Sequence, residues 1–214
     1  MFDLWHFILF MVAAGMLALM PGPGIFYVAA RTLAGGRGEG LASSFGTGLG
    51  GFVHVIGGAI GVSAIVMASA EAFTALKVIG AVYLVYLGIK TWRQARSDAA
   101  QAALLGHSAA IGVRRAFKEG VVVEALNPKT AAFFLAFLPQ FVVLDAGYVA
   151  LQFVVLGTIS VAMNTAVDVA VTYGASAVRD RLAARPGIIT RLRQASGAIL
   201  CALGVTLALA KRPG

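Results

Sequence analysis

The chain has 214 residues, of which 59% are hydrophobic and only 12% are charged. A soluble domain carries about twice that charged fraction, so this composition excludes an ordinary soluble protein and indicates contact with lipid. The formal net charge of +8 does not indicate nucleic-acid binding, because the basic residues lie in short gaps between apolar runs. The length predicts a single transmembrane domain over 1–214.

Six apolar runs follow one another along the chain, and each reaches the roughly 17–25 residues that a spanning helix needs. Only helices satisfy the backbone in lipid at these lengths, so we predict an all-α membrane protein with six transmembrane helices. Their approximate limits are 4–30, 41–67, 72–89, 120–144, 148–173 and 188–210.

The two halves of the chain contain similar segments. Residues 18–29 read ALMPGPGIFYVA and residues 125–136 read ALNPKTAAFFLA, while Gly80-Ala81 with Leu87-Gly88 is echoed by Gly197-Ala198 with Leu203-Gly204. Three helices per half is an odd number, so the halves must have opposite orientations, as in transporters built from inverted repeats. We expect repeat one over about 1–92, repeat two over about 120–214, and a polar, mobile cytoplasmic loop over about 93–119.

The basic residues indicate how the chain is oriented. Of the 17 lysines and arginines, 13 fall in the first, third and fifth gaps or on the flank of the sixth helix. The positive-inside rule places these gaps in the cytoplasm, which puts both termini in the periplasm and the protein in a bacterial inner membrane. These residues are Arg31, Arg37, Lys90, Arg93, Arg96, Arg114, Arg115, Lys118, Arg179, Arg181, Arg185, Arg191 and Arg193.

The first apolar run is interrupted by Pro21, Gly22, Pro23 and Gly24. Two prolines remove two backbone donors and free carbonyls one turn earlier, and such a break persists in lipid only where it is buried or lines a cavity. The half-helix that restarts after it presents N–H groups that suit a carboxylate. We interpret these residues as substrate-binding; the alternative is a simple proline kink.

The fourth run is interrupted at the matching position by Asn127, Pro128 and Lys129, where Pro128 frees the carbonyl of Glu124. Lys129 lies roughly ten residues inside its helix, about 15 Å deep. A lysine at that depth usually has a partner or a ligand, although snorkelling toward the interface is the alternative. Glu124 is either an interfacial residue or a buried acid that takes part in proton coupling.

The fifth run contains Asn164 and Asp168, which are four residues apart and therefore share a helix face. A carboxylate among valines is a functional candidate by default, and burial favours its protonated form, so Asp168 could carry a proton. The alternative is a structural partner for Lys129.

The second run contains His54 on a stripe of glycines that favours close helix packing and leaves a homodimer open. His54 could bind substrate or a proton, or could be a hydrogen-bonded packing residue. The stripe consists of Gly46, Gly50, Gly57 and Gly61.

Motifs for enzymatic chemistry are missing from the sequence. It contains no HExxH, CxxC or Walker pattern, and Ser160 has no histidine or lysine at helical spacing on the fifth run. We therefore predict no metal, no cofactor and no enzymatic activity.

Four segments together resemble the LysE/RhtB family of amino-acid exporters: PGPG, RTLAGGRGEG, LKVIGAVYLVYLGIKTW and EALNPKTAAFFLAFLPQF. The resemblance implies export of amino acids or their derivatives across the inner membrane, driven by the proton gradient. Some branches carry an acidic residue beside the helix-two glycines, where this chain has Gly50-Gly51, which argues against a basic substrate. Asp168 with His54 is more similar to the homoserine/threonine branch.

The residues and the resemblance lead to one hypothesis, a proton-antiporting exporter of small zwitterionic substrates whose site lies where the two broken helices meet. The substrate would bind at the two breaks and Asn164, and protons would be carried by Asp168, Glu124 or His54. The alternatives are a passive channel for small polar solutes and a non-catalytic membrane subunit.

Overall fold

The computed structural model describes residues 4–68, 70–105, 109–143, 146–177 and 186–209, and within these ranges the regular structure is entirely helical. The elements are α1 (Leu4–Leu19), α2 (Pro23–Ala68), α3 (Ala70–Leu105), α4 (Val113–Ala125), α5 (Pro128–Ala132), the π-helix η1 (Phe133–Phe137), the 3₁₀-helix η2 (Leu138–Phe141), α6 (Val149–Ala177) and α8 (Pro186–Leu209).

Several of these helices can cross a membrane. Most of α2, much of α3 and all of α6 are long and apolar enough, and α4 with the segment from α5 to η2 makes a further, bent span. The helix α1 and the last part of α8 are apolar but shorter. The all-α membrane class is therefore confirmed, whereas the number of six spans remains a prediction.

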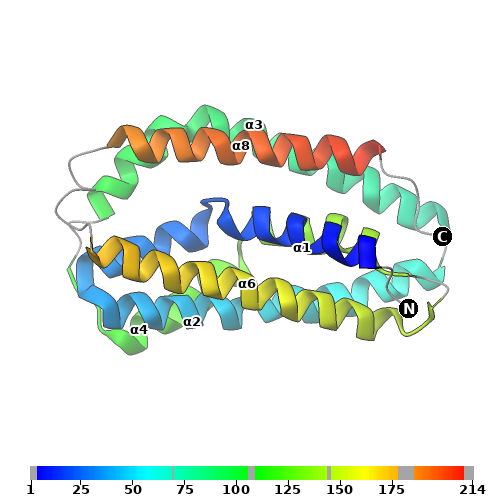
Figure 1. Cartoon of the computed structure of the whole chain (residues 1–214), viewed down its shortest axis with the longest axis horizontal. Helices are drawn as coiled ribbons and strands as arrows, with labels where there is room; N and C mark the ends of the chain where they lie inside the picture. Colours follow the sequence, from blue (N-terminus) through cyan, green and yellow to red (C-terminus); the bar gives the residue numbers. More distant parts are fainter. Residues whose placement is uncertain (1–3, 69, 106–108, 144–145, 178–185, 210–214) are drawn as a thin grey trace.

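Helix α2 bends sharply at Gly36, whose φ of 77° lies in the left-handed region that glycine tolerates. The predicted first helix therefore consists of α1 and the start of α2, and the rest of α2 is the predicted second helix. Figure 1 shows this bend at one end of the molecule, where α4 and α8 begin and α6 ends. At the opposite end of the molecule, α1 begins and α8 terminates.

At the end where α2 bends, hydrogen bonds join the inter-helix segments that the sequence predicts to be cytoplasmic. Arg31 Nη1 donates to the carbonyl of Ala109 at 3.4 Å, and Arg37 Nε donates to Ser176 Oγ at 2.9 Å. The first, third and fifth gaps thus share one end, although its side of the membrane remains a prediction. Arg179, Arg181 and Arg185 lie outside the described residues.

The segment 93–119 differs from the expected loop. Helix α3 continues to Leu105 and α4 begins at Val113, so most of the segment is helical. The polar residues there favoured a loop. A polar segment can also be helical where a helix continues beyond the apolar layer.

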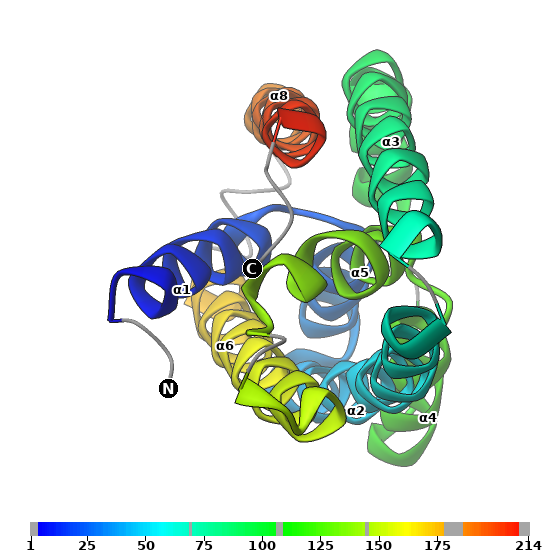
Figure 2. The same ribbon diagram turned by 90° about the vertical axis from the view of Figure 1, so that its right-hand side faces the viewer.

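Helices α3 and α8 pack side by side along one face of the molecule (Figures 1 and 2). A Cβ atom on Gly88 would lie 2.6 Å from the carbonyl oxygen of Gly197, and one on Gly204 would lie 2.8 Å from that of Ala81. Gly88 thus meets Gly197 while Ala81 meets Gly204, so the two helices run antiparallel. Their backbones touch directly at these glycines.

The glycines of the α2 stripe have different surroundings along the helix. A Cβ on Gly46 or Gly50 would collide with backbone carbonyls of α4, which confirms close packing there. At Gly57 and Gly61 no atom lies within 4 Å of the added carbon, so packing does not explain these two glycines.

The segment from α5 to η2 lies in the middle of the helices, as the end-on view in Figure 2 shows. Its phenylalanines form much of the core, with Phe133 and Phe137 stacked at 5.6 Å between ring centroids. Phe141 meets Phe10 of α1 edge-on at the same distance. An apolar groove of about 490 Å³ remains between this segment, α1 and α8.

Replacing Gly88 with Ala should destabilise the protein by about 1–3 kcal/mol, because the added methyl group meets backbone atoms of α8 that cannot move aside. Gly57→Ala is the matched control; it has open space and should stabilise α2 by up to about 1 kcal/mol. Thermal unfolding of both variants in detergent measures the difference. Equal melting temperatures would contradict direct contact between α3 and α8.

Candidate functional site

A small enclosed cavity lies where the two broken helices meet. About 20 Å³ is open to the centres of water molecules, which is room for one or two waters and too little for an amino acid. Its walls come from α1, α2, α4, α5, η1 and α6. The lining residues are Ala14, Leu17, Ala18, Thr47, Gly48, Gly51, Glu124, Thr130, Phe134, Ser160, Val161 and Asn164.

At the first break, the chain leaves the helical conformation between α1 and α2, around Pro21. Lys129 Nζ donates to the carbonyls of Leu17 at 3.1 Å and Met20 at 2.9 Å, and so binds the free carbonyl end of α1. The lysine is only 7% exposed, so the snorkelling alternative is wrong. A Cβ on Gly22 would lie 3.2 Å from the Lys129 side chain, so a larger residue there would press on the lysine.

At the second break, α4 and the segment beginning with α5 are bent by about 40° relative to each other. Asn127 caps α5, because its Oδ1 accepts from the backbone N–H of Lys129 at 3.0 Å. Asn127 Nδ2 then donates to Glu124 Oε2 at 2.9 Å, and Thr130 Oγ1 donates to Glu124 Oε1 at 2.6 Å. Glu124 is therefore a buried residue, and the interfacial interpretation is wrong.

The two breaks are in direct contact. Gly24, next to the Pro23 that begins α2, is so near Glu124 that an added Cβ would lie 2.6 Å from Oε2. Lys129 of the second break reaches the carbonyls of the first. The structure thus brings both predicted motifs to one place.

His54 also belongs to this cluster. Its Nε2 lies 2.8 Å from the carbonyl oxygen of Glu124, the carbonyl that Pro128 frees. A carbonyl only accepts, so Nε2 must carry the hydrogen and donate it. This contact favours the hydrogen-bonded packing interpretation of His54, while a part in proton coupling remains a prediction.

Asp168 is fully buried on α6, one turn after Asn164. Its Oδ2 lies 2.7 Å from Thr47 Oγ1, and its Oδ1 has no hydrogen-bond partner among the described residues. No ion pair joins Asp168 to Lys129 within the described part of the chain, so the structural-partner alternative is not supported. Asn164 itself lines the cavity.

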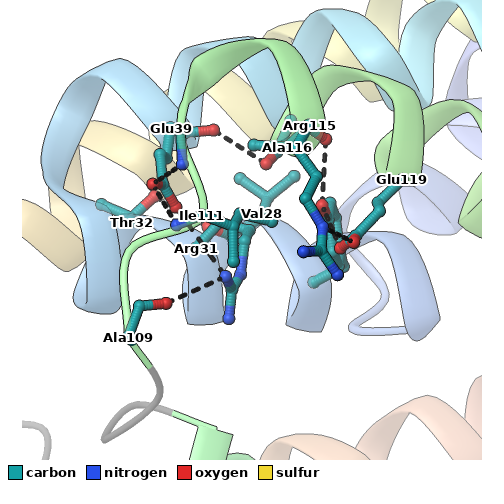
Figure 3. A network of polar contacts seen from close by, with 12 residues as sticks. Val28, Arg31, Thr32, Glu39, Ala109, Ile111, Arg115, Ala116 and Glu119 are labelled. Atoms are coloured by element: carbon teal, nitrogen blue, oxygen red, sulfur yellow. Dashed lines mark hydrogen bonds and ion pairs between the residues drawn. The ribbon is translucent and has the colours of Figure 1, made fainter.

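A second buried polar cluster lies at the bend of α2 and is drawn in Figure 3. Glu39 Oε1 accepts from the backbone N–H groups of Ile111 and Gly112 at 2.7 and 2.6 Å, and Glu39 Oε2 lies 3.8 Å from Arg31 Nη1. These contacts bind the start of α4 to α2. Gly35 leaves the space that the Glu39 carboxylate occupies.

Sequence reasoning missed Glu39 and the hydroxyls of Thr47, Thr130 and Ser160. Signals for some of them were present. Glu39 is the single acid of the RTLAGGRGEG segment, and Thr47 lies seven residues before His54, which places both on one helix face. Thr130 directly follows the Asn-Pro-Lys motif.

Glu39→Ala should leave two backbone N–H groups without an acceptor and destabilise the start of α4 by about 1–3 kcal/mol. Hydrogen exchange should become faster over residues 109–116. Glu119→Ala is the control, because its pair with Arg115 is exposed and worth at most about 1 kcal/mol. Exchange rates that match in the two variants would refute the contact.

The donor role of His54 predicts that Gln can replace it and Leu cannot, because only Gln can donate to the Glu124 carbonyl. His54→Gln should keep transport and its pH dependence. His54→Leu should lose about 0.5–1.5 kcal/mol of stability, because the Glu124 carbonyl then keeps only the donor from the backbone N–H of Asn127. Flux assays and thermal unfolding check the two effects. Loss of proton coupling in a stable His54→Gln variant would instead make His54 a proton carrier.

Comparisons with known proteins find several similar chains. A homoserine/homoserine lactone efflux protein of Salmonella typhimurium is 31% identical over 212 residues, which cover 97% of both chains. An uncharacterized membrane protein of Vibrio cholerae is also 31% identical, over 98% of this chain and 99% of that one. A leucine efflux protein of Salmonella choleraesuis is 25% identical over 149 residues, 70% of this chain and 69% of that protein.

No solved structure matches the chain significantly. A family profile described as LysE type translocator matches residues 15–211. The match covers both broken helices, both buried clusters and the α3–α8 pair. This chain therefore belongs to the LysE-type translocator family, and it is a membrane transport protein and not an enzyme.

Proposed function

We propose that this protein exports amino acids or small amino-acid derivatives from the cytoplasm across the bacterial inner membrane, in exchange for protons. Relatives named for the efflux of homoserine, homoserine lactone and leucine support the substrate class. The observation that carries the proposal is the cavity at the two breaks, with Glu124 in its wall and Lys129 and Asp168 beside it.

The contacts at the breaks suit the two ends of a zwitterion. The carbonyl end of α1 holds the ammonium of Lys129, and the groups at the start of α5 hold the carboxylate of Glu124. A free amino acid carries the same two charged groups on one carbon. We propose that the substrate exchanges with these internal partners, its ammonium near the α1 carbonyls and Asp168 and its carboxylate near Lys129 and α5.

Substrate entry requires movement, because the cavity is smaller than an amino acid. Two inverted three-helix repeats, with the termini in the periplasm, would supply this movement by rocking against each other. The contacts between α3 and α8 support the repeats. The sequence echo pairs Gly80 with Gly197 and Gly88 with Gly204. Exchanging the halves therefore turns the Gly88–Gly197 contact into an expected contact between Gly204 and Gly80, and the observed contact of Gly204 is with the next residue, Ala81.

The alternatives have less support. A passive channel needs a continuous polar lining, whereas the polar residues that line this cavity are interrupted by apolar ones such as Phe134 and Val161. A non-catalytic subunit would need no buried charged cluster. The homodimer remains a prediction.

Everted membrane vesicles from cells that overproduce the protein test the function. Homoserine and leucine should accumulate when respiration acidifies the lumen, lysine should not, and a protonophore should abolish accumulation. Flux that persists without the pH gradient would instead indicate a channel.

Asp168→Asn should reduce proton-driven accumulation by about tenfold or more, because the amide cannot release a proton. Exchange of labelled for unlabelled substrate, which needs no net proton movement, should be affected less. Glu119→Gln is the matched control at an exposed carboxylate and should resemble the wild type. Normal accumulation by Asp168→Asn would remove this residue from the coupling mechanism.

A further inference from the structure

We infer that the two buried carboxyl groups of the site have opposite protonation states in this conformation: Asp168 carries a proton that it donates to Thr47, and Glu124 is ionised. The inference deepens the proposed function, since it identifies which acid exchanges the proton during transport.

The partners of Glu124 are both donors. Asn127 Oδ1 accepts from the backbone N–H of Lys129, which fixes the amide so that its NH₂ group faces Glu124 Oε2. The hydroxyl of Thr130 has Glu124 Oε1 as its acceptor at 2.6 Å. Each carboxylate oxygen thus accepts one hydrogen bond, and Lys129 contributes an opposite charge nearby. Glu124 is therefore well stabilised as an anion.

The surroundings of Asp168 are different. Thr47 Oγ1 lies 2.7 Å from Asp168 Oδ2 and 2.8 Å from the carbonyl oxygen of Ser44, yet a hydroxyl has one hydrogen. If Asp168 were ionised, Thr47 could satisfy only one of these acceptors, and the buried anion would have at most one donor. If Asp168 is protonated, it donates to Thr47, which donates to Ser44, so each short contact contains a hydrogen.

The charges that face Asp168 do not change this conclusion. They are Glu124 from α4, which disfavours a second anion, and Lys129 from α5, which is held by the α1 carbonyls. The group from α2 that contacts the carboxyl is the neutral hydroxyl of Thr47, while on its own helix the hydroxyl of Thr172 donates to the backbone carbonyl of Asp168. A fully buried, singly bonded carboxylate without an adjacent cation is costly, so the neutral form is favoured.

The two acids therefore have different roles. Glu124 remains ionised and compensates Lys129, whereas Asp168 gains and loses the proton. Thr47 is a positioning residue for this exchange, because its hydroxyl must turn from Ser44 to Asp168 when the proton leaves.

Infrared spectroscopy of the full-length protein in liposomes at neutral pH tests the inference. The wild type and Glu124→Gln should show the C=O band of a protonated carboxyl group, and Asp168→Asn should lack it. A band that is absent from the wild type, or one that Glu124→Gln removes and Asp168→Asn keeps, would overturn the assignment.

Two further variants keep the test valid if a carboxyl variant folds poorly. Thr47→Val should shift the frequency of the band, since the acid loses its hydrogen-bond partner, and Thr47→Ser should restore it. An unchanged band in Thr47→Val would contradict the contact. These spectra require no substrate, so a failure of amino-acid export in vesicles and a failure of this assignment can be told apart.

Discussion

The structure depends on one constraint: backbone groups that prolines free inside an apolar protein must find other partners. Two helices are broken in this chain, and each break leaves carbonyl groups without a helical donor. The carbonyls of Leu17 and Glu124 each accept one turn hydrogen bond, from the backbone N–H groups of Met20 and Asn127. Lys129 adds a donor for the carbonyls of Leu17 and Met20, and His54 adds one for the carbonyl of Glu124. Because these added donors come from other segments, the two breaks are held at one place.

This arrangement also explains why ionisable groups are tolerated at such depth. Lys129 lies at the negative end of one half-helix, and Glu124 lies beside the positive end of another. Each charge is therefore compensated by a helix end and by the opposite charge nearby. Asp168 has one side-chain hydrogen-bond partner among the described residues, and the nearby Lys129 is held by the α1 carbonyls. This difference separates a structural pair from a group that can exchange a proton.

Much of the helical framework and of the site could be predicted from the sequence. Apolar length placed the helices, and proline with glycine or asparagine marked both breaks, because these residues leave strong local signals. The partners of Lys129 could not be predicted, because these contacts join residues more than 100 positions apart. The partners of Glu124 could not be predicted either, because they depend on the bend between α4 and α5. The helical parts of 93–119 were missed because their polar residues were taken to indicate a loop. Polarity indicates that a segment lies outside the apolar layer, and it does not distinguish a helix from a loop.

Glu39 was missed for a related reason. An acid among glycines and arginines looks like a solvated loop residue, and only the bend at Gly36 turns it toward the start of α4. The roles of Thr47 and Thr130 likewise depend on neighbours from other helices. Residues that break a helix or carry an ionisable group in an apolar run could thus be identified from the sequence, whereas hydroxyl groups that only act as their partners could not.

The direct backbone contact between α3 and α8 restricts how the molecule can change shape. Helices separated by large side chains can slide, because the side chains change rotamer; helices that touch at Gly88, Gly197 and Gly204 have no such layer. The two helices should therefore move as one stiff unit. In the proposed transport cycle this unit would move against α1 and the segment from α5 to η2. The apolar groove lies between them, so a lipid bound in the groove would ease or hinder that movement.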